Sequence, residues 1–149
     1  MTYELAEVRD PADWLAYHAI RRQELFEGKG RHGIYDENHP HDRAPDAHPY
    51  LLKLDGVPIG TTRLDMRKDG SAIFRLVAIT AAEQGKGHGR VLGQLVEDRA
   101  KALGATTLYV NAAETAVGYY RSTGWREHVW DEAELIGISL MAVQMTKSL

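Results

Sequence analysis

The chain has 149 residues, a formal net charge of −3 and 44% hydrophobic residues, which are ordinary values for a globular domain. It contains no cysteine, which excludes disulfides, thiolate metal sites and a cysteine nucleophile. The slightly acidic balance disfavours nucleic-acid binding, which usually requires a basic surface. No apolar run approaches the roughly 20 residues of a membrane span, and the N-terminus has no signal-peptide pattern. We therefore expect a cytoplasmic protein that forms one domain over residues 1–149.

The first fifty residues predict a strand, a helix and a long loop. Residues 3–8 alternate as an edge strand does. Asp10 and Pro11 predict a helix start, and apolar residues at helical spacing extend this helix to about Glu27, in one piece or two. Glycines and prolines predict a loop over residues 28–49. This loop holds four of the seven histidines, His32, His39, His41 and His48.

Residues 50–79 predict an antiparallel meander of three strands. Asp55-Gly56 is a strong hairpin signal between the strands Tyr50–Leu54 and Val57–Asp65. A second turn ends at Gly70, and the third strand extends from Ser71 to Ile79.

Helices and strands alternate in the second half. A glycine-rich loop opens into an amphipathic helix that ends at Gly104, and a strand follows over residues 106–110. A helix over 112–122, a strand over 124–130 and a last strand over 136–145 complete the pattern. Helices that cross between strands imply an α/β fold with a mixed, mainly antiparallel central sheet flanked by helices.

The glycine-rich loop is a candidate anion site. Gly85, Gly87 and Gly89 leave backbone N–H groups accessible at a helix start, where the helix dipole favours phosphate, and Lys86 and Arg90 add positive charge. No Lys-Ser or Lys-Thr pair follows the last glycine, so this is not a Walker A loop. The G-x-G-x-G spacing also differs from the dinucleotide fingerprint. A plain strand-to-helix turn is the alternative.

The loop and its flanks resemble one enzyme family. Gln84-x-x-Gly87-x-Gly89 is similar to the Q/R-x-x-G-x-G/A signature of the GNAT superfamily of N-acyltransferases. Residues 75–79 resemble the strand that precedes this signature, Asn111 follows the next strand, and residues 119–125 are similar to the family's F-Y-x-x-x-G-F segment. The resemblance covers roughly residues 50–130 and implies the GNAT fold and acetyl-CoA as the acyl donor.

The resemblance also implies where the donor binds. Gln84 begins the loop whose backbone N–H groups would bind the pyrophosphate: Gly85, Lys86, Gly87, His88, Gly89 and Arg90. The backbone of Val77 and Ile79 would pair with the pantetheine arm, and an N–H group there would polarise the acetyl carbonyl. Asn111 would lie on the opposite wall, near the pantetheine or an ordered water. The His88 side chain would lie near a phosphate or be exposed.

Acyl transfer to an amine requires loss of a proton from the amine and neutralisation of the departing thiolate. Tyr120 occupies the position of the family's tyrosine general acid, with a packing role as the alternative, and Asn111 is the second catalytic candidate. The strand over 71–79 contains no carboxylate, so the family's strand glutamate is missing. Asp65, Glu24, Glu83 or a water relay are the alternatives for the base.

We expect an N-acetyltransferase that uses direct attack in a ternary complex, since no cysteine can carry the acyl group. The acceptor is an amine of open identity. One alternative is a catalytically inactive CoA-binding sensor or interaction module, and another is a nucleotide- or metal-binding domain. We expect no metal, no nucleic acid and no membrane partner, and the resemblance implies a homodimer.

Overall fold

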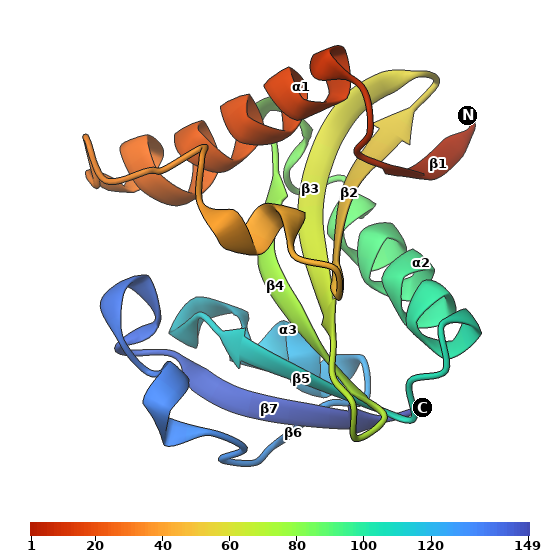
Figure 1. Ribbon diagram of the computed structural model, residues 1–149, viewed down its shortest axis with the longest axis vertical. Helices are drawn as coiled ribbons and strands as arrows, with labels where there is room; N and C mark the ends of the chain where they lie inside the picture. Colours follow the sequence, from red (N-terminus) through yellow and green to blue (C-terminus); the bar gives the residue numbers. More distant parts are fainter.

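The computed structural model describes residues 1–149, and its centre is a seven-stranded sheet with helices on both faces (Figure 1). The strand order is β1-β2-β3-β4-β5-β7-β6. Every neighbouring pair is antiparallel except β4 and β5, which are parallel. The predicted mixed, mainly antiparallel sheet flanked by helices is confirmed.

The elements follow the predicted order. The strands are β1 (Tyr3–Glu7), β2 (Ala47–Leu54), β3 (Val57–Met66), β4 (Ser71–Ile79), β5 (Thr107–Ala112), β6 (Arg126–Glu127) and β7 (Val143–Ser148). The helices are α1 (Pro11–Arg21), α2 (His88–Ala102) and α3 (Val117–Ser122). None of them is both long and apolar enough to span a membrane. Asp10 caps α1 as predicted, because its side chain accepts a hydrogen bond of 2.8 Å from the N–H group of Asp13.

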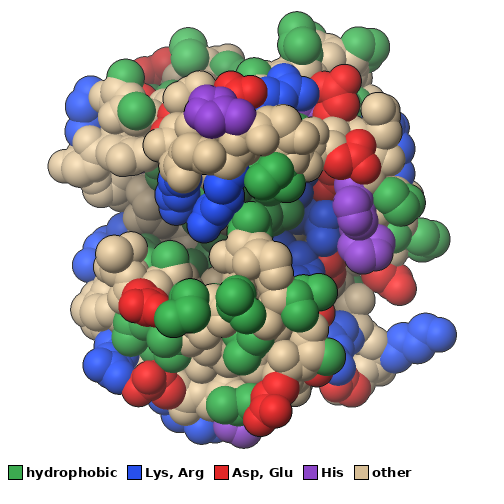
Figure 2. Space-filling view, turned by 90° about the vertical axis from the view of Figure 1, so that its left-hand side faces the viewer, with side chains coloured by type: hydrophobic (Ala, Val, Ile, Leu, Met, Phe, Trp, Pro, Cys, Tyr) green, Lys and Arg blue, Asp and Glu red, His purple; other side chains and the backbone are tan.

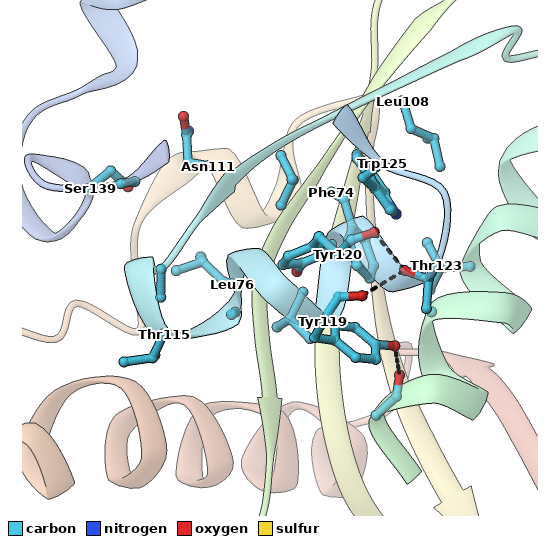
Figure 3. Close-up of a pocket in the computed structure, with 18 of the residues that line it drawn as sticks. Phe74, Leu76, Leu108, Asn111, Thr115, Tyr119, Tyr120, Thr123, Trp125 and Ser139 are labelled. Carbon is cyan, nitrogen blue, oxygen red and sulfur yellow. Dashed lines mark hydrogen bonds between the residues drawn. The ribbon is translucent and has the colours of Figure 1, made fainter. Parts of the chain in front are cut away.

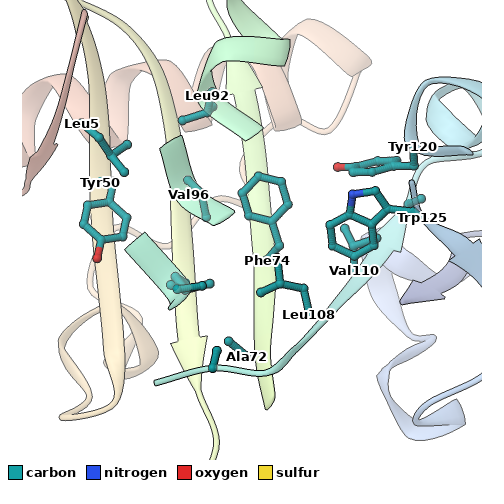
Figure 4. Close-up of a cluster of buried hydrophobic side chains, with 14 of the residues drawn as sticks. Leu5, Tyr50, Ala72, Phe74, Leu92, Val96, Leu108, Val110, Tyr120 and Trp125 are labelled. Atoms are coloured by element: carbon teal, nitrogen blue, oxygen red, sulfur yellow. The ribbon is translucent and has the colours of Figure 1, made fainter. Parts of the chain in front are cut away.

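Two clusters of buried side chains hold the layers together. In the larger cluster, Leu92 and Val96 of α2 lie over the sheet, and Trp125 stacks on Phe74 with ring centroids 6.4 Å apart (Figure 4). The smaller cluster lies on the other face, where α1 packs against β2 and β4. Burial of each such large side chain stabilises the fold by about 1.5–3 kcal/mol.

Strand β4 carries one extra residue relative to β3. Arg63 pairs with Arg75 and Thr61 with Ala78, so two steps along β3 correspond to three along β4. Leu76 lies in this β-bulge with φ +52°, a left-handed conformation that non-glycine residues rarely adopt.

The bulge changes which side chains of β4 face each layer. Phe74, before the bulge, belongs to the cluster under α2, and the partly buried Val77 and Ile79 after the bulge pack against that cluster. Ala78 faces α1 instead. Pairing between β4 and β5 ends at Phe74 and Val110, and beyond this point the two strands diverge (Figure 1).

The N-terminal helix and loop differ from the prediction in form. The helix predicted to reach Glu27 is α-helical only to Arg21 and continues as the π-helical turn η1 (Arg22–Phe26) and the 3-10 turn η2 (Glu27–Lys29). The predicted loop over 28–49 contains the 3-10 turn η3 (Pro40–Arg43) and the first residues of β2.

The prediction of a last strand over residues 136–145 is wrong at its start. The chain turns at η7 (Gly137–Ser139), where Gly137 has φ +56°, and β7 begins only at Val143. The alternating Ile136, Ile138 and Leu140, which suggested a strand, are exposed at the surface.

Two further elements are shorter than predicted. The strand over 124–130 is reduced to β6, because the Trp130 indole stacks on Tyr109 and donates a hydrogen bond of 3.2 Å to the carbonyl of Val110. The helix predicted from Ala112 begins at Val117, since Ala112 still belongs to β5 and the 3-10 turn η5 (Glu114–Ala116) intervenes.

Candidate functional site

A cleft of about 900 Å³ opens where β4 and β5 diverge. Side chains from both strands, from α2 and α3, and from the segment before β7 line it, and more than half of the lining residues are hydrophobic (Figure 3). Of the residues predicted for the site, the cleft brings together Val77, Gly89, Arg90, Asn111 and Tyr120. Ile79, Gln84 and residues 85–88 do not line this cleft.

The glycine-rich loop presents free donors at the start of α2. The N–H groups of residues 85–90 donate no hydrogen bond within the protein. Gly85 and Gly87 have φ +77° and +88°, so glycine is needed there for backbone conformation. The Gln84 amide donates a hydrogen bond of 2.9 Å to the carbonyl of Ile79 and ties the loop to the end of β4. Six free N–H groups at the start of a 15-residue helix make this loop a candidate anion site.

The His88 side chain points away from this anion site. It is 5% exposed, its Nδ1 lies 2.7 Å from the Tyr3 hydroxyl, and its Nε2 lies 3.0 Å from Glu83. Neither expectation for this imidazole, beside a phosphate or exposed, describes it, because it links α2 to β1. Only the backbone N–H group of His88 stays a candidate for ligand binding.

Tyr120 lies near the centre of the cleft, with Leu76 and Asn111 on one side of it and Trp125 on the other (Figure 3). It is 7% exposed, and its ring meets Trp125 edge-on at 5.3 Å. The hydroxyl has no hydrogen-bond partner in the protein, and burial raises the pKa of Tyr120 above its usual value of 10. This phenol therefore stays protonated, and its O–H group is free for a ligand.

Asn111 is held between two neighbours. Its amide nitrogen donates to Glu134 at 3.3 Å, and its oxygen accepts from Gln144 at 3.0 Å. Both ends of the side chain are thus held by neighbours in the protein, which fixes the orientation of Asn111 in the cleft wall.

A second cavity of about 490 Å³ opens from the same gap on the α1 side. The two cavities share Phe74, Leu76, Asn111, Ile138 and Ser139. Tyr35 and Phe26 add aromatic surface to the second cavity, and His39 and His41 line it with ring centroids 4.4 Å apart. The two cavities are therefore adjacent at the gap between β4 and β5.

The gap is visible from the outside as a hollow between two parts of the molecule (Figure 2). Basic side chains border the hollow above, and the main cleft includes Lys29 and Arg31. Hydrophobic side chains gather below it, and the segment before β7 exposes Ile136, Ile138, Leu140 and Met141.

A chain of ion pairs crosses the sheet beside the second cavity. Its six members alternate in charge: Arg21–Asp42 at 2.9 Å, Asp42–Arg63 at 2.9 Å, Arg63–Asp65 at 2.8 Å, Asp65–Arg75 at 2.7 Å and Arg75–Glu134 at 2.6 Å. Hydrogen bonds from Arg75 lower the pKa of Glu134, so this carboxyl is ionised at neutral pH. The carboxylates of the chain are thereby neutralised by arginines.

Residues 32–149 match the family model of the acetyltransferase (GNAT) domain. The chain belongs to the GNAT acetyltransferase family. A protein from Lactobacillus plantarum assigned as an N-acetyltransferase is similar in structure, with a TM-score of 0.78, 26% identity and coverage of 100% of this chain and 99% of that one. No curated protein sequence gives a significant match.

Two further solved structures share the fold of this GNAT chain. An acyl-CoA N-acyltransferase from Pseudomonas aeruginosa gives a TM-score of 0.80 at 18% identity, with 99% of each chain covered. The PaiA N-acetyltransferase from Thermoplasma acidophilum, solved in complex with coenzyme A, gives 0.71 at 15% identity, with 100% of each chain covered.

The carboxylates considered as the base of this GNAT protein lie outside both cavities. Asp65 is bound by Arg63 and Arg75, and Glu24 accepts a hydrogen bond of 3.0 Å from the N–H group of Ala81. Glu83 pairs with His88. None of the three is placed to take a proton from a ligand.

Three residues that line the GNAT cleft are not among the site residues predicted from the sequence. Leu76 marks the bulge, but nothing in the apolar run of β4 signals its left-handed backbone. Ser139 lies in a segment that reads as a strand. Tyr119 is not among the candidate site residues from the sequence, yet it is 37% exposed, and its hydroxyl donates to the carbonyl of Gly89 at 3.2 Å. That bond bridges α3 and α2 across the cleft.

Proposed function

We propose that this protein transfers an acetyl group from acetyl-CoA to an amine by direct attack in a ternary complex. The observation that carries this proposal is the junction of two cavities at the point where β4 and β5 diverge. The larger cavity leads to the free N–H groups of the glycine-rich loop and suits an elongated donor with a pyrophosphate. The smaller cavity offers room for an acceptor. We also propose that the chain is one domain, because one sheet includes strands from Tyr3 to Ser148.

The residues of the larger cavity fit acetyl-CoA, which supplies an activated thioester when bound. The N–H groups of residues 85–90 would bind the pyrophosphate, and Arg90 would add charge at the same end. Beyond Phe74 the edge of β4 is not paired with β5, so backbone groups of Val77 and Ile79 are candidates for pairing with the pantetheine arm and for polarising the acetyl carbonyl.

Tyr120 is our candidate for assisting the leaving group. In the reaction a carbon–nitrogen bond forms, the carbon–sulfur bond breaks, and the sulfur leaves with the electron pair. The nitrogen loses one proton as the amide forms, which balances the proton that the sulfur gains and would restore the Tyr120 hydroxyl. The free O–H group of Tyr120 would donate a hydrogen bond or a proton to that sulfur in an apolar surrounding, where such a bond is strong. Asn111 would hold the opposite wall through Glu134 and Gln144.

Donor binding and turnover can be measured separately. Acetyl-CoA at about 100 times its dissociation constant should stabilise the protein by about 2.7 kcal/mol, which raises Tm by about 5–10 °C for this chain length. Turnover is followed by release of the CoA thiol, and the protein adds no background because it has no cysteine. The acceptor panel comprises glycinamide, phenylalaninamide, 2-phenylethylamine and spermidine.

We expect a Tm shift with acetyl-CoA but not with ATP, and turnover on at least one amine. Binding without turnover on the whole panel would favour a CoA-binding sensor or interaction module. A shift with ATP or zinc alone would remove the acetyl-CoA proposal.

A further inference from the structure

A buried histidine behind the smaller cavity has no role in the function proposed above. His18 on α1 is 8% exposed, and its Nδ1 lies 2.6 Å from the hydroxyl oxygen of Tyr35. Tyr35 itself lines the smaller cavity. The two side chains therefore form a continuous path from the cavity to a titratable group in the interior.

The Tyr35 ring is fixed in the orientation that this path requires. Phe26 meets it edge-on at 5.0 Å, and the guanidinium of Arg22 lies 5.2 Å from the ring centroid. On the far side, Trp14 stacks on the His18 ring at 5.5 Å. Because both rings are held, the hydroxyl and Nδ1 face each other, and the neutral imidazole can accept at Nδ1 while Nε2 carries its proton.

The groups around His18 keep it neutral at pH 7. Charged and titratable side chains face it from α1, from η1, from the loop before η3 and from η3: Tyr17, Arg21, Arg22, Tyr35, Glu37 and Asp42. Burial lowers the pKa of His18 and outweighs the opposite effect of Asp42. Burial also raises the pKa of Tyr35, so its hydroxyl keeps the proton until a base accepts it.

The other acidic groups of the smaller cavity are poor candidates for a base. Asp42 and Glu134 are each bound by arginine. Asp36 is exposed, and its carboxylate accepts a hydrogen bond from the N–H group of Asn38. His18 is the buried neutral base that a cavity-lining hydroxyl contacts directly.

We propose that Tyr35 and His18 form a proton relay that deprotonates the acceptor amine; this inference rests on the proposed N-acetyltransferase function. The ammonium gives one proton to the Tyr35 oxygen while the Tyr35 O–H proton moves to Nδ1 of His18. The ammonium becomes a nucleophilic amine, and the imidazole becomes an imidazolium. After the product leaves, the imidazolium returns its proton to solvent through the same hydroxyl.

The relay is tested by pH profiles of kcat/KM with two primary amines from the panel, phenylalaninamide and 2-phenylethylamine. Their amine pKa values are about 8 and about 10, by analogy with an α-amino group and lysine. In the wild type, the relay accepts either amine as an ammonium ion, so the acidic limb is the same for both. In Tyr35→Phe and His18→Gln, only amine that is already neutral reacts.

At pH 7 about 10% of the weaker base and about 0.1% of the stronger base are neutral. We therefore expect kcat/KM to fall about tenfold for phenylalaninamide and about 1,000-fold for 2-phenylethylamine, the second value lying within the usual range for a general base. The acidic limb should move to the pKa of each acceptor. The double variant should lose no more than either single variant, because both act in one path.

Tyr17→Phe is the matched control, since its ring lies 5.5 Å from His18 and its buried hydroxyl has no hydrogen-bond partner. It should leave both profiles unchanged. If His18→Gln folds poorly, Tyr35→Phe carries the test. If the acidic limbs of the Tyr35→Phe profiles stay at the wild-type position, the relay is overturned, while the proposed acetyltransferase function stands. No turnover by the wild type on any panel amine would refute the proposed function itself, and the relay with it.

Discussion

Replacing Asp42 with alanine removes the carboxylate that neutralises two buried arginines. Asp42 is 4% exposed, and Nη1 atoms of Arg21 and Arg63 both lie 2.9 Å from its Oδ1. Breaking a buried ion pair by removing one partner costs about 3–5 kcal/mol, because the other charge stays buried and uncompensated. Arg63 keeps Asp65, whereas Arg21 keeps no carboxylate. We therefore expect the lower end, about 3 kcal/mol.

For a chain of this length, that loss corresponds to a decrease in Tm of about 6–12 °C. Thermal and urea unfolding followed by circular dichroism measure it. Glu37→Ala is the control, because it breaks an exposed ion pair with Arg22 and should change the free energy of unfolding by less than about 1 kcal/mol. A decrease in Tm for Asp42→Ala no larger than that for Glu37→Ala would show that the buried chain of ion pairs does not stabilise the fold.

Three further predictions concern the donor site, the leaving group and pH. Gly87→Ala should raise the dissociation constant for acetyl-CoA about tenfold in calorimetry. Gly56 has a similar φ of +82° in a distant hairpin, so Gly56→Ala should lower only the free energy of unfolding, by about 1–2 kcal/mol. Equal acetyl-CoA affinities of the two variants would contradict the anion site. Tyr120→Phe should lower kcat at least tenfold with Tm unchanged, since its hydroxyl has no partner to lose; wild-type kcat would leave Tyr120 a packing role. Arg75 lowers the pKa of Glu134 in the folded state. The ion pair between them therefore stabilises the fold above about pH 4.5, and this stabilisation is lost as the pH falls through the lowered pKa of Glu134. The stability difference between wild type and Glu134→Gln should therefore shrink on acidification, and a difference independent of pH would contradict this linkage.

The parts of the site that follow from short sequence segments could be predicted. Gly85 and Gly87 adopt the positive φ that their type favours, and the helix they precede begins at His88. Tyr120 lies in the cleft because its segment is a short helix that follows β5 after one 3-10 turn. In each case the signal lies within a few residues of the feature.

Features that depend on distant partners could not be predicted. Arg21 and Glu134 belong to one chain of ion pairs although 113 positions separate them, and no local pattern connects them. The pairing of His18 with Tyr35 likewise depends on how the loop before η3 returns to α1. Alternation in residues 136–140 favoured a strand, but a glycine turn overrides it and the apolar side chains stay at the surface.

The extra residue in β4 matters more for the binding groove than for the stability of the fold. Deleting Leu76 would restore a common phase between β3 and β4, and the backbone beyond Phe74 would then be positioned to continue its ladder with β5. In such a shortened chain, we expect β4 and β5 to pair along the stretch where the groove now opens. Its core would be largely preserved, because Phe74 and the residues before it keep their places. We therefore expect the groove between β4 and β5 to depend on this one extra residue, while the packing on either side of it does not.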